Sequence, residues 1–309
     1  MPLYVTHCDR NYASRAMALV ASMRLHECSD LIYVICHDQD AFEQLEGMGD
    51  IHLVPIHLSE VEDSYRELLI AKSDRSHLEY LFCLTPFILL FANTKTPNQL
   101  LIYLDSDLYF FNHPSKAIPV SNEPYDVAIV THNFPAKLEH LEVYGKYNVG
   151  WLAFAQTDNS LKLLRWWADK CAASTSIKKD GSIFADQKYL DSFDSMGASV
   201  YAISSIPRNG APWNCFDVES GINKELTVSG TPLIFFHFSG LRRKRLITVL
   251  GYSGYGIRPS NRLKKFIFRP YIESLSKFEN SRNSKPMFDS RKFGLKDWVR
   301  IFLFADFLI

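Results

Sequence analysis

Short apolar runs alternate with amphipathic stretches along the first two hundred residues of the chain. An apolar run bounded by turn-forming residues is typical of a buried strand, whereas apolar residues three and four apart are typical of a helix. The runs predict strands at residues 3–6, 31–36, 51–55, 100–104, 126–130, 149–154, 199–203 and 233–238. The helical spacing predicts a first helix capped by Asn11 and others at 42–48, 76–92, 161–173 and 189–193. This alternation favours an α/β fold, a mainly parallel sheet with helices on both faces.

Composition is that of one large domain with an appendage. The chain has 309 residues, of which 47% are apolar, enough for a full core. Its six cysteines include no C-x-x-C pair, which favours a reducing compartment over a disulfide framework or a structural zinc site. The first residues enter a strand without the regions of a signal peptide, and no run of about 18 apolar residues predicts a transmembrane helix. We therefore expect a cytoplasmic protein.

Charge divides the chain near Leu241. Residues 242–300 carry 16 Lys/Arg and 4 Asp/Glu, whereas the chain as a whole has no net charge. We therefore expect a domain at 1–241 and a basic C-terminal extension at 242–309. The extension ends in an aromatic and apolar stretch at 298–309, a pattern typical of a helix lying in an anionic membrane interface. The alternative is that this helix packs on the first domain or on a second subunit.

Candidate chemistry begins at Asp105-Ser106-Asp107, directly after the apolar run at 100–104. Ligands of open α/β sheets bind beyond the carboxyl ends of strands, and two carboxylates there are hard oxygen ligands for a divalent metal. Asp-x-Asp is also common at strand ends without a metal. A phosphatase nucleophile motif is the sharper alternative, but it requires Thr or Val where this chain has Tyr109.

Five segments, read together, resemble the GT-A nucleotide-sugar glycosyltransferases, above all the retaining glycosyltransferase family 8 and its bacterial relatives. They lie at 5–13, 71–80, 105–107, 148–150 with 186–187, and 237–243, and the likeness spans about residues 3–245. It implies a GT-A, Rossmann-like fold. Each segment also has an ordinary explanation: a helix N-cap for Asn11 or Asp186, a solvated helix face for Lys72 and Arg75, a structural histidine for His237.

The resemblance assigns a role to each matching residue. Asp105, Asp107 and His237 would bind the metal, and Asp186 and Gln187 would act on the reacting sugar. The donor would contact Thr6, Asp9, Asn11, Lys72, Arg75, Asp105, Ser106, Asn148, Gly150, Gly240 and Arg243. The family pattern His-x-x-Gly-x-x-Lys has Arg243 at the Lys position, which keeps the charge and changes its geometry. Lys72 and Arg75, three residues apart, are expected to share a helix face.

The resemblance implies a metal-dependent hexosyltransferase that uses a UDP-sugar, retains the anomeric configuration and serves bacterial surface polysaccharide or glycolipid synthesis. Mixed oxygen and imidazole ligation favours Mn²⁺, with Mg²⁺ a weaker substitute. Ala211-Pro212-Trp213-Asn214 resembles a segment on the acceptor side of the cleft. We expect a glycan or lipid-linked acceptor, peripheral contact with the inner face of the plasma membrane, and no nucleic acid. A sugar nucleotidyltransferase and a non-catalytic carbohydrate-binding protein are the alternatives.

Overall fold

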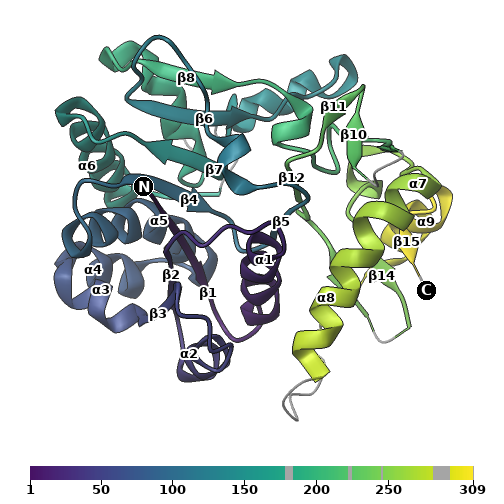
Figure 1. The fold of residues 1–309 in the computed structure, drawn as a ribbon, viewed down its shortest axis with the longest axis horizontal. Coiled ribbons are helices and arrows are strands. Elements are labelled where there is room, and N and C mark those ends of the chain that lie inside the picture. The colour runs from purple at the N-terminus through teal and green to yellow at the C-terminus, as the bar shows by residue number, and fades with distance from the viewer. Residues whose placement is uncertain (178–183, 222–224, 245, 281–292, 309) are drawn as a thin grey trace.

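A seven-stranded sheet is the centre of the molecule (Figure 1). The computed structural model describes residues 1–177, 184–221, 225–244, 246–280 and 293–308. The strands are β1 Pro2–Cys8, β2 Ile32–Cys36, β3 Leu53–His57, β4 Leu100–Leu104, β6 Val127–Thr131, β7 Tyr147–Phe154 and β8 Val200–Ile203. Their order is β3-β2-β1-β4-β7-β6-β8, and only β7 runs against its neighbours. The mainly parallel sheet predicted from the sequence is confirmed.

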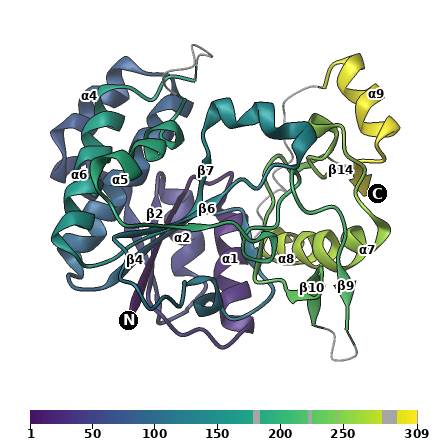
Figure 2. The ribbon, with the colours of Figure 1, turned by 90° about the horizontal axis from the view of Figure 1, so that it is seen from above.

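Helices cover both faces of this sheet (Figure 2). One face carries α1 Ala13–Leu25 and α2 Gln39–Glu46. The other carries α3 Leu58–Ser64, α4 Arg66–Asp74, α5 His77–Lys95 and α6 Asp158–Ala173. Side chains that alternate along β1 divide between the two cores, since Tyr4 packs with α1 and Val5 packs with α5. The two cores hold the carboxyl ends of β1 and β4 at one edge of the sheet.

Helix α5 packs on one face of the sheet, within one of these two cores. Ser76 and Glu79 form a capping box at its start, and Pro86 lies inside it. Among the described residues it is the only helix that is long and apolar enough to cross a membrane by length and composition. Most of its apolar side chains are buried against the sheet and α6, as in the core helix of a globular domain.

The remaining elements form a second region outside the main sheet. A two-stranded ribbon joins β5 Leu108–Phe110 to β12 Phe235–His237. The remaining short strands are β9 Glu219–Ser220, β10 Leu226–Val228, β11 Thr231–Pro232, β13 Arg242–Arg243, β14 Thr248–Val249 and β15 Phe307–Leu308. The remaining helices are α7 Asn261–Leu263, a π-helical turn Lys264–Phe268, α8 Arg269–Asn280 and α9 Leu295–Leu303. Short 3₁₀ segments lie at Pro114–Ala117, Ala136–Tyr144, Gln187–Ser192, Asp194–Met196, Ile206–Arg208 and Ser253–Tyr255. Helix α8 lies along α1 (Figure 1), so the basic extension packs on the first domain.

Three sequence-based expectations need correction. The apolar run at 233–238 forms β12, which pairs with β5 rather than joining the main sheet. Asn11 does not cap the first helix: Tyr12 occupies the N-cap position of α1 and makes no side-chain capping bond. The apolar end is not one helix, because α9 stops at Leu303 and β15 then pairs with β14. Buried Asp306 holds this turn by accepting from the Tyr252 and Ser253 amides.

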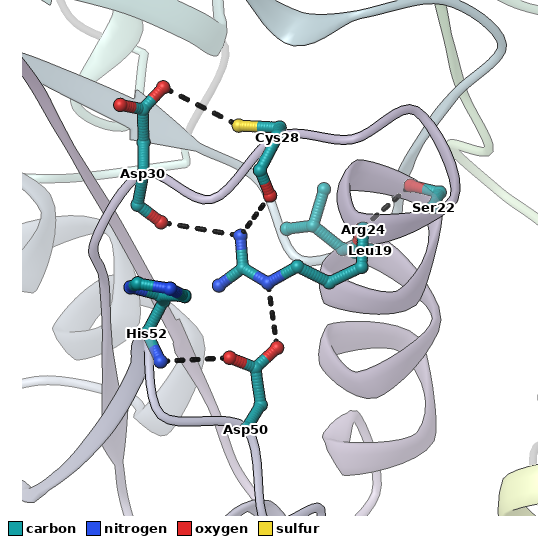
Figure 3. A network of polar contacts seen from close by, with 7 residues as sticks. All are labelled: Leu19, Ser22, Arg24, Cys28, Asp30, Asp50 and His52. Carbon is teal, nitrogen blue, oxygen red and sulfur yellow. Dashed lines mark hydrogen bonds and ion pairs between the residues drawn. The ribbon is translucent and has the colours of Figure 1, made fainter.

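The C-terminal end of α1 is fixed by Arg24 (Figure 3). Its Nε donates to Asp50 at 2.6 Å, and its Nη1 donates to the carbonyls of Cys28 at 2.7 Å and Asp30 at 3.2 Å. Asp50 also accepts from the His52 amide at 2.9 Å. These bonds tie α1 to the loops that lead into β2 and β3, at the edge opposite the candidate site.

All six cysteines are buried and none forms a disulfide. Burial raises the pKa of Cys28 and Cys83 to about 11, so these thiols remain protonated at neutral pH.

Candidate metal centre

Asp105, Asp107 and His237 lie together at the carboxyl edge of the sheet. The two aspartates occupy the link between β4 and β5, and β12 pairs with β5 so that Leu108 lies opposite His237. The imidazole Nε2 of His237 is 3.1 Å from Asp107 Oδ1 and 3.5 Å from Asp105 Oδ2. One ligand atom from each residue lies within 4.8 Å of the others. This Asp-Asp-His cluster brings together residues 130 positions apart and has the size and ligand set of a divalent metal site.

The three groups shift one another's pKa values. Burial raises the pKa of Asp105, and the charge of Asp107 adds to this effect. Burial acts in the same sense on Asp107, but interaction with His237 outweighs it and lowers the pKa of Asp107. The two carboxylates raise the pKa of His237 although burial opposes the charged ring. The imidazole and the carboxylates thus favour one another's charged forms, and a bound cation would replace this interaction.

Gly150 in β7 gives His237 its space. A Cβ at this position would lie 2.8 Å from His237 Nδ1 and 2.6 Å from Asn148 Oδ1, distances that side chains do not tolerate. The Gly150 carbonyl accepts from the Asp105 amide at 2.9 Å, and its amide donates to Asn148 Oδ1 at 3.1 Å. The lack of a side chain at Gly150 therefore lets the imidazole approach the backbone closely, and β7 fixes the backbone of Asp105.

Asp186 and Gln187 stand at the start of the 3₁₀ segment Gln187–Ser192. Burial, reinforced by the charge of Asp105, raises the pKa of Asp186 to about 7. The Asp186 carbonyl accepts from the indole of Trp167 at 2.9 Å. Gln187 Nε2 donates to the Tyr144 carbonyl at 2.9 Å, which leaves its oxygen as the group able to face a ligand. Asp186 therefore lies in the same buried electrostatic environment as the metal-binding candidates.

The first strand-to-helix turn carries Asp9 and Asn11 at the same edge. Asp9 accepts from the Tyr12 amide at 2.9 Å and from Asn11 Nδ2 at 2.7 Å, so the two predicted donor contacts bond each other. Thr6 is buried, and its hydroxyl has no partner in the described structure. Ser106, between the two aspartates, is also buried.

Lys72 and Arg75 do not share a helix face, contrary to the expectation from their spacing. Helix α4 ends at Asp74, and Arg75 is extended because Ser76 begins the next helix. Lys72 pairs with Glu62 at 2.8 Å, whereas Arg75 donates to the Cys171 carbonyl at 2.6 Å and to Thr175 at 2.9 Å. In this structure each side chain is bound to protein groups.

Gly240 and Arg243 follow β12. Gly240 has a φ of 78°, in the left-handed region that favours glycine. The Arg243 guanidinium pairs with Glu279 and donates to Ser276 at 3.1 Å, both on α8. Its side chain is 15% exposed, and its Nε is buried without a partner. Arg243 thus joins β13 to α8 in this structure.

Sequence reasoning missed a polar chain beneath the cluster. The Tyr103 hydroxyl donates to Asp105 Oδ1 at 2.9 Å and lies 3.1 Å from His7 Nε2, and His7 Nδ1 lies 2.9 Å from His37 Nε2. Burial lowers the pKa of His7 to about 3 and of His37 to about 4, so both rings are neutral. Tyr103 precedes Asp105 by two residues on one strand, a period that places both side chains on the same side and was a usable signal.

The predicted acceptor segment lies beside the metal-binding candidates. The Trp213 indole donates to the His132 carbonyl at 2.7 Å, and its ring centroid is 5.6 Å from that of His237. Trp213 also contacts the rings of Phe134 and Tyr255. Its role in acceptor binding remains a prediction.

Comparison with known proteins supports the fold. No protein-family profile matches the chain. Two proteins of Bacillus subtilis (strain 168) are similar to it. The uncharacterized protein YfnD is 29% identical over 283 residues, 89% of each chain, and the uncharacterized protein YfnF is 27% identical over 255 residues, 77% of this chain and 81% of its own.

Two solved structures share the architecture. The galactosyltransferase LgtC, in complex with donor and acceptor sugar analogues, matches with a TM-score of 0.52 and 12% identity over 92% of this chain and 98% of LgtC. The bifunctional glycosyltransferase WbbM matches with a TM-score of 0.50 and 13% identity over 89% of this chain and 49% of WbbM. The predicted GT-A fold is therefore confirmed.

Proposed function

We propose that this protein is a metal-dependent glycosyltransferase that moves a hexose-type sugar from a UDP-sugar to an acceptor hydroxyl with retention of anomeric configuration. The observation that carries the proposal is the meeting of Asp105, Asp107 and His237 at the carboxyl edge of a GT-A sheet. The solved structures that share this fold are named as glycosyltransferases, which supports the same class of reaction here.

The ligand set fits Mn²⁺ better than Mg²⁺, because one of the three ligands is an imidazole. When bound, such a cation offsets the negative charge that develops on the departing diphosphate. The protein contributes the orientation of the ligands: β12 positions His237, Tyr103 donates to Asp105, and β7 leaves room for the imidazole. These contacts come from the protein itself and fix the directions of the ligand atoms.

In the proposed reaction the bond from the anomeric carbon to the phosphate oxygen breaks. A bond to the acceptor oxygen forms on the same face, and the hydroxyl proton passes to the leaving diphosphate. The family resemblance assigns Gln187 to the face of the sugar opposite the leaving group, and because its amide is a poor nucleophile a glycosyl-enzyme intermediate is disfavoured. Because its nitrogen is bound to Tyr144, the Gln187 oxygen is the group that can stabilise positive charge on that carbon. Asp186 accepts hydrogen bonds from sugar hydroxyls.

Thermal unfolding with a panel of nucleotide sugars tests the proposal first. A ligand that binds only the folded protein raises its unfolding temperature, so we expect a rise with one UDP-sugar that requires Mn²⁺. Transfer assays then compare Asp107→Asn with Asp40→Asn, a control carboxylate whose side chain is 61% exposed. We expect a loss of activity of about 10³-fold in the first variant only. Absence of any nucleotide-sugar binding, or full activity of Asp107→Asn, would sink the proposal.

We also propose that the protein acts at the cytoplasmic face of an anionic membrane, on a glycan or lipid-linked acceptor of a bacterial surface polymer. Helix α9 supports this with an apolar ridge formed by Leu295, Val299, Phe302 and Leu303, which are 82%, 57%, 59% and 68% exposed. Lys296 and Arg300 border this α9 ridge on the same helix. An exposed apolar ridge bordered by cations matches a bilayer interface in shape and charge.

Sedimentation with vesicles tests the membrane contact. We expect the protein to pellet with anionic vesicles at low salt, and Phe302→Glu to remain in solution because it places a charge on the α9 ridge. Vesicles of zwitterionic lipid serve as the control for charge. A protein that stays in solution with anionic vesicles would refute the contact, and self-association that Phe302→Glu abolishes would assign the ridge to a second copy.

A further inference from the structure

Arg15, in the first turn of α1, was not among the predicted site residues. Its Nη2 donates to the Leu241 carbonyl at 3.2 Å and its Nη1 to the Asn11 carbonyl at 3.4 Å. The guanidinium carbon lies 4.4 Å from the centroid of the Tyr12 ring. The side chain therefore bridges the first strand-to-helix turn and the segment after β12, two parts of the predicted donor site.

The guanidinium of Arg15 is not neutralised by an ion pair. Across the described ranges no carboxylate lies within ion-pair distance of it, and its two hydrogen bonds to carbonyls leave some of its five N–H donors unused. Asp107 and Glu279 act on it only from farther away, together with Tyr271 and Tyr12. The residue as a whole is of intermediate exposure.

The position of Arg15 suits an anion. It lies at the N-terminus of α1, where unpaired amides and the helix dipole favour negative charge. Backbone contacts connect it to the metal side: Leu241, whose carbonyl Arg15 binds, donates to the Phe238 carbonyl at 3.1 Å, and the Phe238 amide donates to the Asp107 carbonyl at 3.0 Å. A diphosphate bound by a cation on Asp107 would therefore come within reach of this guanidinium, which can bind phosphate oxygens bidentately.

Arg243, unlike Arg15, is already paired with a carboxylate. Its guanidinium pairs with buried Glu279, so releasing it toward a ligand would leave a carboxylate uncompensated. Glu279 also accepts from Ser14 at 3.5 Å, which ties the pair to α1. The contact between Arg243 and Glu279 accordingly holds α8 against β13, and the bond from Ser14 joins this pair to the first domain.

We propose that Arg15 is the arginine that binds the diphosphate of the donor, while Arg243 holds α8 in place. The inference rests on the proposed function and assigns the phosphate contact to a position outside the family motif. The chief alternative is that Arg15 only clamps α1 to Leu241. A clamp would change stability and would weaken all nucleotide ligands alike, whereas a phosphate contact would weaken only ligands that carry phosphate.

Titration calorimetry in Mn²⁺ with UDP and with uridine separates these readings. We expect Arg15→Gln to weaken UDP binding about 10- to 100-fold and to leave uridine binding unchanged, because charge-assisted bonds to phosphate are lost. Arg15→Lys should fall between, since it keeps the charge without the fork. Arg10→Gln is the matched control, because Arg10 lies on the same turn but faces Asp40 at 3.5 Å.

A double variant, Arg243→Gln with Glu279→Gln, tests the other half of the proposal. Replacing both partners leaves no unpaired buried charge, and we expect UDP affinity within about threefold of the wild type. Unchanged UDP affinity in Arg15→Gln, or an equal loss for UDP and uridine, would overturn the inference while the proposed function stands. If the wild type binds no nucleoside diphosphate in a panel that includes UDP, the proposed function fails and the inference with it.

Discussion

The two ends of α1 carry the same residue type in opposite situations. At the C-terminal end, Arg24 binds the Asp50 carboxylate and two carbonyls, and this network closes the edge of the sheet away from the site (Figure 3). At the N-terminal end, Arg15 bonds only carbonyls and a ring face within the described structure. One end of the helix is anchored by contacts within the protein, and the other keeps charge available for a ligand.

The carboxyl groups of Asp50 and Asp186 differ in the same way as the two arginines. Burial alone would raise the pKa of Asp50, but the Arg24 hydrogen bond outweighs it, and the pKa of Asp50 is lowered. At Asp186, on the site edge, burial outweighs a hydrogen bond with Thr85 and raises the pKa to about 7. Folding therefore stabilises the charged form of one carboxylate and destabilises that of the other. Unfavourable electrostatics of this kind are common at functional sites, in keeping with the proposed function.

The largest expected effect is on the free energy of unfolding, at the C-terminal end of α1. Arg24→Gln leaves Asp50 and two carbonyls without their donor, and we expect a loss of about 3 kcal/mol in the free energy of unfolding. Urea denaturation measures the loss, and calorimetry should show unchanged UDP affinity. Arg15→Gln should give the reverse pattern. If both variants changed both quantities equally, the distinction between the two ends would be lost.

The pH dependence of the free energy of unfolding should reveal the raised pKa of Asp186 at the candidate site. Up to a pH of about 7 the folded protein keeps a proton on Asp186 that the unfolded chain releases near pH 4. The stability held at low pH is therefore lost as pH rises, by about 2 to 3 kcal/mol between pH 5 and pH 8 in metal-free protein. Asp186→Asn should remove this share of the slope in urea denaturation. A slope that the variant leaves intact would contradict the assignment.

Gly150→Ala should disturb the metal centre without touching a ligand residue. The new Cβ would meet His237 Nδ1 at 2.8 Å, so the imidazole must shift, and we expect Mn²⁺ affinity to fall by about tenfold or more. Calorimetric titration with Mn²⁺ measures the change. Gly254→Ala is the matched control, since nothing lies within 4 Å of its Cβ. Equal Mn²⁺ affinity in both variants would show that the space beside His237 is unimportant.

The smallest effect should come from Arg10, beside Asp9 at the open edge. Its ion pair with Asp40 spans 3.5 Å between side chains that are 62% and 61% exposed. Such pairs contribute little, so Arg10→Gln should change the free energy of unfolding by less than about 0.5 kcal/mol and leave UDP affinity unaltered. A clear loss of UDP affinity would extend the ligand-binding surface beyond Arg15.

Local patterns were sufficient for the main sheet and for the aspartate pair. The apolar run at 100–104 is β4, because five apolar residues between turn-forming residues favour a central strand, and four of them are buried. The aspartates after it project from the carboxyl end, where the sheet leaves room for a ligand. His237 could be linked to them only through the family resemblance, since its place depends on pairing between β12 and β5.

Long-range partners were beyond the reach of the sequence. Nothing near Arg243 announces that Glu279, 36 positions later, will bind it. Spacing alone put Lys72 and Arg75 on one face, although Ser76 and Glu79 form a capping box that signals a new helix and therefore a break before it. Arg15 looked like an ordinary helix residue because its neighbour Leu241 lies 226 positions away.

The pairing of β5 with β12 also has a consequence for biosynthesis. Asp107 leaves the ribosome 130 residues before His237, an interval on the order of 10 s at ordinary elongation rates. During that time the nascent chain can present two carboxylates but not the imidazole that completes the ligand set. On the proposed function, a cation held by all three ligands can bind only after translation has passed β12 and the β5–β12 ribbon has formed.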